Sequence, residues 1–184
     1  MTSSWIHRDK LRASWVLLLL GAEDDVSPDG ESKLSHWEVG VANADNLVDT
    51  KTQQVKFGGV SSEFDLLDNL LSWLDQFRYE NTVIVTPSVV TLQKLRRRIV
   101  AIRSKKDTLR GFSHICVESL LTEYFDHSLA AYGIERNSFS PPRVTSTGAD
   151  TEEVVSTGGV NDFWKSWQRL YRLVPADELR GNPL

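Results

Sequence analysis

Residues 14 to 22 read Ser14-Trp15-Val16-Leu17-Leu18-Leu19-Leu20-Gly21-Ala22. The run from Val16 to Leu20 is apolar without interruption, a pattern that is typical of a strand with both faces buried inside a sheet. Such a strand needs other strands beside it and helices above and below it. The run therefore predicts the central strand of an α/β domain.

More extended stretches follow this strand. Residues 23–30 contain acids, a proline and an Asp-Gly pair, which together predict a turn. Extended stretches are then expected at residues 36–42 and 53–57, with a polar turn at residues 43–46 between them. The first third of the chain should therefore form a three-stranded antiparallel meander.

Helices and strands alternate in the next part of the chain. Residues 62–65 match a helix-capping motif, and apolar residues recur after it at helical spacing. These residues are Phe64, Leu67, Leu70, Leu71, Leu74 and Phe77. Further strands are expected at residues 82–86 and 112–117. Further helices are expected at residues 92–102, from the spacing of Leu92, Leu95, Ile99 and Ile102, and at residues 118–132.

The resulting order is β-β-β-α-β-α-β-α, in which the alternating second half implies parallel strands joined by crossover helices. This order predicts an α/β, RNase H-like fold with a five-stranded mixed sheet and an additional C-terminal helix. Residues 1–134 would form this domain, and residues 135–160, rich in Ser, Thr, Gly and Pro, would form a flexible linker. Residues 161–184 would form an aromatic amphipathic helix and a tail.

Composition limits the class of protein. The chain has 184 residues, 40% hydrophobic and 25% charged, which suits one hydrophobic core. Cys116 is the only cysteine, so no disulfide can form within the chain. No apolar run approaches the roughly 20 residues that a membrane-spanning helix needs, and no signal-cleavage pattern is present. We expect a cytoplasmic protein that does not contact membranes.

Four segments resemble those of one nuclease family. They are residues 63–74, 83–86, 95–98 and 127–134. Together they are similar to the 3′ to 5′ exonuclease domains of family B DNA polymerases and their stand-alone relatives, over about residues 14–134. The resemblance implies an exonuclease fold, a role in DNA metabolism, and four acids that hold catalytic metal ions.

The acids that the resemblance implies are replaced in this sequence. Leu20 and Ala22 stand where the first motif carries Asp and Glu, and Thr91 stands where the second motif carries its acid. Only Asp177 could remain of the last motif. Two-metal hydrolysis of a phosphodiester needs several converging carboxylates, which Leu and Thr cannot replace. We therefore expect a degenerate exonuclease domain that is not an enzyme, with no catalytic residue, no metal and no other cofactor.

An alternative is an atypical metal-dependent 3′ to 5′ exonuclease whose acids occupy another register. Its ligands would come from Glu23, Asp24, Asp25, Asp65 and Asp68. The competing interpretation places the first three in a solvated turn and the last two on the water-facing side of a helix.

The segment from Lys94 to Arg110 is strongly basic within a chain whose net charge is -4, and Asp107 is its only acid. Such a segment is typical either of a phosphate-binding patch or of a solvated helix face. If it binds nucleic acid, the contacts are expected from Lys94, Arg97, Arg98, Arg103, Lys105 and Lys106.

The last predicted helix carries an apolar stripe too large to leave in water. The stripe consists of Phe163, Trp164, Trp167, Leu170, Tyr171 and Val174. It either covers the sheet of its own chain, which we favour, or it binds a protein partner or a second copy through Trp164, Trp167 and Tyr171.

These features favour a non-catalytic exonuclease-fold protein that acts as a nucleic-acid-associated or protein-interaction module. The alternatives are the atypical exonuclease and a structural adaptor that uses the aromatic helix without nucleic acid.

Overall fold

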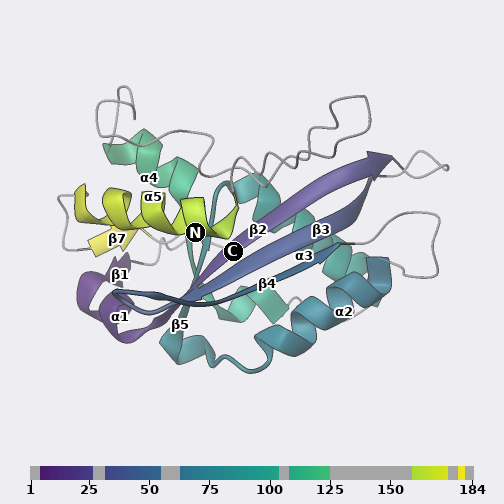
Figure 1. Cartoon of the computed structure of the whole chain (residues 1–184), viewed down its shortest axis with the longest axis horizontal. Helices are drawn as coiled ribbons and strands as arrows, with labels where there is room; N and C mark the ends of the chain where they lie inside the picture. The colour runs from purple at the N-terminus through teal and green to yellow at the C-terminus, as the bar shows by residue number, and fades with distance from the viewer. Residues whose placement is uncertain are drawn as a thin grey trace, which may run out of the picture.

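The computed structural model describes residues 5–26, 32–54, 63–103, 108–124, 159–173 and 178–180 (Figure 1). The predicted capping residue Ser62, residues 127–134, Asp177 and all but the last two residues of the predicted linker lie outside these ranges. The division of the chain at residues 134 and 160 therefore stays a prediction.

The central sheet has five strands in the order β4-β3-β2-β5-β6. These are β2 (Trp15–Val26), β3 (Ser32–Ala42), β4 (Leu47–Gln54), β5 (Thr82–Thr86) and β6 (Ser113–Cys116). The pairs β2–β3 and β3–β4 are antiparallel, whereas β2–β5 and β5–β6 are parallel. This is the predicted α/β, RNase H-like mixed sheet with the apolar run at its centre.

The expected turn at residues 23–30 is wrong for its first part. Strand β2 continues to Val26, and Glu23 pairs with Leu34 of β3 while Asp25 pairs with Lys33. The register shifts between Ala22 and Glu23 and again before Asp25, so the strand contains bulges there. Pairing with β3 satisfies the backbone of this acidic segment, which local turn preference could not indicate.

Some of the other predicted strand and turn boundaries agree with the structure and some do not. Strand β5 has the predicted bounds, and the turn at residues 43–46 is confirmed by the Asn43 side chain, whose Oδ1 accepts hydrogen bonds from the backbone of Asp45 and Asn46. Strand β4 instead begins at Leu47, six residues before the predicted stretch. It is the edge strand and mostly polar, so hydrophobic content did not reveal it.

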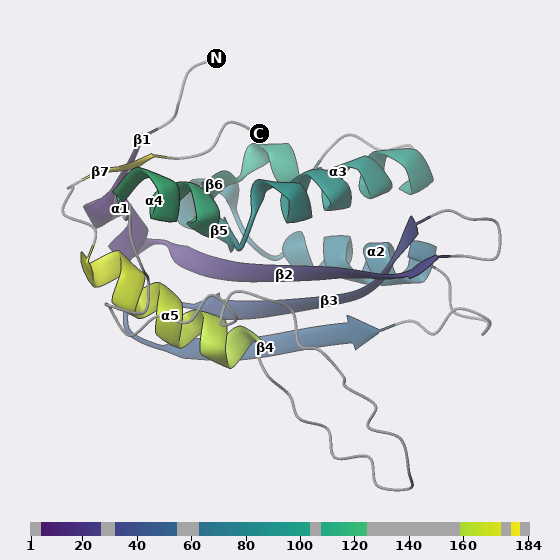
Figure 2. The ribbon, with the colours of Figure 1, turned by 90° about the horizontal axis from the view of Figure 1, so that it is seen from above.

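Helices cover both faces of the sheet. On one face lie α2 (Glu63–Leu74) and α3 (Val89–Arg103), and on the other lie α1 (Arg8–Ala13), α4 (Val117–Tyr124) and α5 (Val160–Leu173). Figure 2 shows α5 on the side of the sheet opposite α2 and α3. Two 3-10 helices, η1 (Tyr79–Asn81) and η2 (Thr108–Gly111), precede β5 and β6.

Alternate residues of β2 enter two separate cores. Val16, Leu18 and Leu20 pack on the α5 side, whereas Leu17 and Leu19 pack against α2 and α3. The predicted stripe of α2 is right except at Phe64, which is 45% exposed. Leu66 and Trp73 are buried as well, so the buried face of the helix is wider than the periodicity indicated.

The ends of the described chain meet in a small second sheet that the sequence did not predict. Strand β1 (Trp5–His7) pairs antiparallel with β7 (Glu178–Arg180). Ile6 of β1 is buried in the same core as α5, so these terminal strands border the main domain. Among the described residues, no helix has the length and apolar character needed to cross a membrane.

Candidate functional site

A row of paired residues crosses the α5 face of the sheet near the middle of β2. Leu20 of β2 pairs with Glu38 of β3, and Glu38 pairs with Thr52 of β4. Directly paired residues project from the same face, with Cβ atoms about 4.5–5.5 Å apart. The position where the first acid was expected on β2 therefore has a carboxylate on the neighbouring strand.

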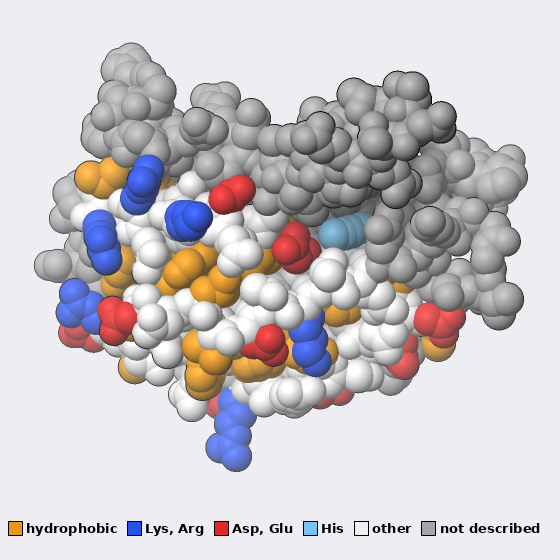
Figure 3. Space-filling view, viewed as in Figure 1, with side chains coloured by type: hydrophobic (Ala, Val, Ile, Leu, Met, Phe, Trp, Pro, Cys, Tyr) orange, Lys and Arg blue, Asp and Glu red, His pale blue; other side chains and the backbone are white. Residues whose placement is uncertain are grey.

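The next row repeats this arrangement. Ala22, at the second expected acid position, pairs with His36, whose Nε2 lies 3.3 Å from the Oγ1 atom of Thr52. His36 and Glu38 are two residues apart on one strand, so both side chains lie on the α5 face. Figure 3 shows a histidine beside an acidic side chain on the face of the molecule where α5 lies.

Glu38 is held at the start of α5. Its Oε1 accepts a hydrogen bond from the backbone N–H of Val160 at 3.2 Å, and Gly159, with φ of +104°, allows the backbone to turn into the helix beside this carboxylate. Its Oε2 is buried and has no hydrogen-bond partner among the described residues. Burial raises the pKa of Glu38, and the hydrogen bond from Val160 partly opposes this change. The carboxyl can therefore hold a proton at higher pH than an exposed glutamate.

The described residues do not by themselves make a metal site. Within the part of the chain that the structure describes, no three His, Cys, Asp or Glu side chains come together. The side chains of Glu23, Asp24 and Asp25 lie outside that part, although their backbone belongs to β2. A complete set of ligands for two metal ions is thus not present among the described side chains, and we derive no step through a metal.

The other acids and the threonine that the sequence singled out lie elsewhere. Asp65 and Asp68 are on α2, on the face of the sheet opposite Glu38. Thr91 lies in the first turn of α3, where its backbone N–H donates to the Oγ of Ser88 at 3.3 Å. Ser88 therefore caps this helix, and Thr91 belongs to the cap.

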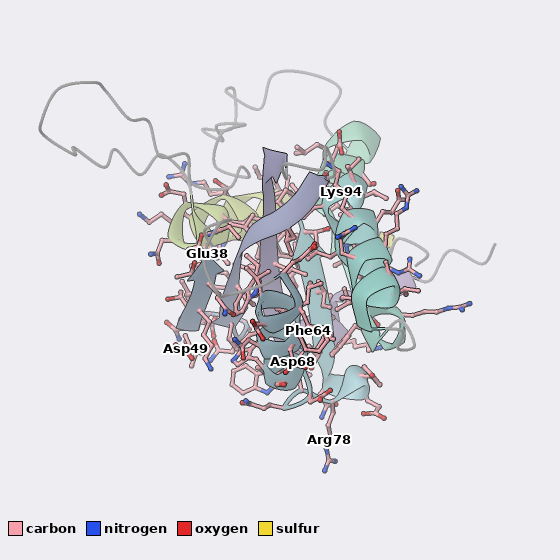
Figure 4. All side chains as sticks on the ribbon, turned by 90° about the vertical axis from the view of Figure 1, so that its right-hand side faces the viewer. Glu38, Asp49, Phe64, Asp68, Arg78 and Lys94 are labelled. Atoms are coloured by element: carbon pink, nitrogen blue, oxygen red, sulfur yellow. The ribbon has the colours of Figure 1, made fainter. Side chains whose placement is uncertain are left out.

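The basic segment is only partly described. Lys94 and Arg97 are exposed on α3, and Arg96 is half-buried. The side chains of Arg103, Lys105 and Lys106 lie outside the described residues, and Arg110 is exposed in η2. Figure 4 labels Lys94 on α3 and Glu38 on the opposite side of the sheet. The basic face and the Glu38 row are therefore separate features.

Arg98 differs from the rest of the basic segment. Its Nε and Nη2 donate to the two carboxylate oxygens of Glu63 at 2.7 and 2.6 Å, and Oε1 of Glu63 also accepts from the backbone of Leu34. Glu63 is 6% exposed and Arg98 26%. This bidentate pair joins α3, α2 and β3, so the guanidinium is engaged inside the protein rather than directed at phosphate.

The aromatic helix covers its own sheet. Phe163, Trp164, Trp167 and Leu170 are buried in the core between α5 and β2, and Tyr171 stacks on Trp167 with ring centroids 5.9 Å apart. The partner-binding surface predicted for Trp164 and Trp167 is thus occupied by the chain itself. The intramolecular alternative that we favoured is the one the structure shows.

A second buried polar pair lies on the α3 face. The Oγ1 of Thr86 and the Nε2 of His114 are 2.7 Å apart at adjoining positions of β5 and β6. His114 is 2% exposed, and burial together with the nearby charge of Arg96 lowers its pKa to about 4. The imidazole is therefore neutral at physiological pH and serves the packing of α3 on the sheet.

Glu38 and His36 were missed by the sequence analysis. The signal was present in residues 36–42, where His36, Glu38 and Gly40 alternate with Trp37, Val39 and Val41. Such alternation separates two faces of a strand. Only the register against β2 reveals that the polar face lies beside Leu20 and Ala22.

No protein-family model matches the sequence, and no curated protein matches it. Solved structures share its fold. The nuclease domain of 3'hExo, a DEDDh family member, bound to rAMP, has a TM-score of 0.51 and 13% identity over 92% of this chain and 96% of that chain. A full-length 3'-exonuclease has a TM-score of 0.51 and 12% identity over 92% of this chain and 86% of that chain. These likenesses define a nuclease-fold protein with an exonuclease-like, RNase H-like domain.

The expectation that this chain is not an enzyme is corrected by these comparisons. The structures that share its fold are a nuclease domain and an exonuclease. Apolar residues at Leu20 and Ala22 do not establish a loss of catalysis, because Glu38 places a carboxylate directly beside the first of them. The narrower resemblance to polymerase exonuclease domains stays a prediction.

Proposed function

We propose that this nuclease-fold protein binds nucleic acid through the outward face of α3. The observation that carries the proposal is the exposure of Lys94 and Arg97, three residues apart and hence on one face of a helix that contains no acid. The nuclease fold of the whole domain supports the same ligand class. Arg103, Lys105 and Lys106 extend the positive charge in sequence.

The chemistry of this face suits phosphate rather than base recognition. Lys and Arg side chains on an exposed helix attract the nucleic-acid backbone and release its counterions, with little dependence on sequence. Arg98 is left out of the proposed contacts because Glu63 engages its guanidinium. We therefore expect binding that is weakly sequence-selective and strongly dependent on salt.

Fluorescence anisotropy with labelled single-stranded DNA and RNA, in EDTA, tests the proposal. The Lys94→Glu/Arg97→Glu variant should weaken binding at least tenfold and should reduce the slope of log affinity against log salt by roughly one to two. The matched control is Lys165→Glu/Arg169→Glu, an equal charge change on the exposed side of α5. Equal losses in both variants, or no binding by the unaltered protein at low salt, would contradict the proposal.

A second candidate function, favoured by the position of Glu38, is hydrolysis of a bound nucleic-acid strand. Glu38 lies on the face of the sheet where Leu20 occupies the expected acid position, and Oε2 is not used in a described hydrogen bond. Burial raises its pKa, so this carboxyl holds a proton at higher pH than an exposed glutamate, which suits a group that takes up and releases a proton.

Release of nucleotides from labelled single strands, with Mg²⁺ or Mn²⁺ supplied, tests hydrolysis. Glu38→Gln keeps the size of the side chain and its hydrogen bond to Val160, and it should reduce release at least a hundredfold. Glu80→Gln, an exposed residue of η1, is the control and should have no effect. Release that is insensitive to Glu38→Gln, or no metal-dependent release at all, would refute this second function without affecting the binding proposal.

A further inference from the structure

A cavity of about 570 Å³ lies between the edge strand β4 and helix α2, on the face of the sheet opposite Glu38. It is lined by Trp37, Thr50, Lys51, Thr52, Gln53, Asn69, Ser72, Trp73 and Gln76. This volume is in the range that small-molecule sites occupy, roughly 300–1,000 Å³. The cavity takes no part in the functions proposed above.

The charge on the lining of the cavity is positive only. Lys51 is the one charged residue among the lining residues, and no Asp or Glu is among them. The other polar side chains on this face are the amides of Gln53, Asn69 and Gln76 and the hydroxyl of Ser72, which can both donate and accept hydrogen bonds. Thr50 and Thr52 pair with Gly40 and Glu38, so their side chains lie on the other face of the sheet. Asp49 and Asp68, labelled in Figure 4, belong to the same strand and helix but do not line the cavity. The lining thus suits a ligand with one anionic group and several uncharged polar atoms.

The two tryptophans are held as fixed walls. The Nε1 of Trp37 donates to the backbone oxygen of Leu66 at 2.9 Å, and Trp73 packs edge-to-face on Phe77. The ammonium of Lys51 lies 5.8 Å from the centroid of the Trp73 ring. A cation at this distance is attracted to the ring face, which keeps the ammonium at the cavity while Lys51 itself is exposed.

We infer that this cavity binds a nucleoside monophosphate. Lys51 would meet the phosphate, because an ammonium is a compact point charge that binds phosphate well. The amides of Asn69 and Gln76 would meet the edge of the base, since side-chain amides can donate and accept together on a base edge. The aromatic walls would exclude water from one side of the base.

Isothermal titration calorimetry tests this inference with AMP, CMP, adenosine, ribose 5-phosphate and inorganic phosphate as separate probes. AMP or CMP should bind with a dissociation constant below about 1 mM, and at least fivefold more tightly than ribose 5-phosphate or phosphate. Lys51→Gln should weaken the nucleotide about tenfold, the loss expected of one charge-assisted contact, and should leave adenosine unchanged. Asn69→Ala should weaken both nucleotide and adenosine.

The control variant is Lys165→Gln, which removes an equal charge from the exposed side of α5 and should leave nucleotide binding unchanged. Lys51 and Asn69 are exposed, so their substitution should preserve the fold, which circular dichroism verifies. The inference is overturned if neither AMP nor CMP binds at 5 mM, if inorganic phosphate or ribose 5-phosphate binds as tightly as the nucleotide, or if Lys51→Gln binds AMP like the unaltered protein. If nucleotide binding fails, the proposals for α3 and Glu38 still stand, because those are tested by binding and hydrolysis of nucleic-acid strands.

Discussion

Leu20 of β2 and Glu38 of β3 are directly paired across the sheet, and their side chains lie on the face that α5 borders. Glu38 thereby supplies a carboxylate next to the site where the first acid was expected. The same glutamate accepts from the first backbone N–H of α5, so one residue joins the candidate site to the packing of the last helix. Its protonation should consequently affect both stability and function.

Glu38 should make stability depend on pH in a defined direction. Its pKa is raised above the ordinary value of 4.5 in the folded state, so the folded protein favours the protonated form. Stability from this residue is therefore full below the unfolded pKa and is lost as the pH rises through the folded pKa. Urea unfolding at pH 4 and pH 7 should show that Glu38→Gln gains stability relative to the unaltered protein at the higher pH. A constant difference between the two proteins would contradict the raised pKa.

Burial of His114 should make the protein less stable at acid pH, the opposite direction to the effect of Glu38. Its folded pKa of about 4 lies below the ordinary 6.5, so the unfolded chain takes up the proton first. Stability is lost as the pH falls from about 6.5 to about 4, by up to roughly 3 kcal/mol. His114→Asn cannot titrate, and its unfolding free energy should change less between pH 7 and pH 4.5. The prediction fails if both proteins lose stability equally over that interval.

The pair of Glu63 and Arg98 should be needed for folding. Arg98→Met would leave the carboxylate of Glu63 buried without its cation, which typically costs about 3–5 kcal/mol. Arg97→Met removes the same charge from the exposed neighbouring position and should change the unfolding free energy by less than about 0.5 kcal/mol. Urea denaturation of both variants checks the contrast, and comparable small effects would show that the bridge contributes little.

Gly40 sets how closely α5 approaches the sheet. A Cβ at this position would collide with the side chain of Val160 and press on Leu47. Gly40→Ala should lower the unfolding free energy by about 1–3 kcal/mol, the usual cost of overpacking. Val160→Ala in the same chain should restore part of the loss. Thermal melts of the two single variants and the double variant measure this coupling, and strictly additive effects would place the collision elsewhere.

Some elements could be predicted from the sequence because their pattern of apolar and polar residues matches the burial or hydrogen bonding of their side chains. The apolar run from Val16 to Leu20 indicated a central strand because both of its faces are buried. The α2 periodicity indicated a helix, and Asn43 indicated a turn because its side chain bonds to residues two and three positions later. In each case the apolar spacing or the side-chain hydrogen bond that identifies the element can be seen within a few residues of sequence, so composition and spacing contain the information.

Contacts between residues that are far apart in the sequence determined the remaining features of the fold and of the candidate site. The extension of β2 to Val26 depends on β3, the engagement of Arg98 depends on Glu63, 35 residues away, and the hydrogen bond of Glu38 to Val160 joins residues 122 apart. Turn and charge preferences of single segments cannot reveal such partners, because the free energy of these contacts is gained only when distant parts of the chain meet. From the sequence alone Glu38 is an ordinary polar residue of a strand. Only the register of β3 against β2 places it beside Leu20.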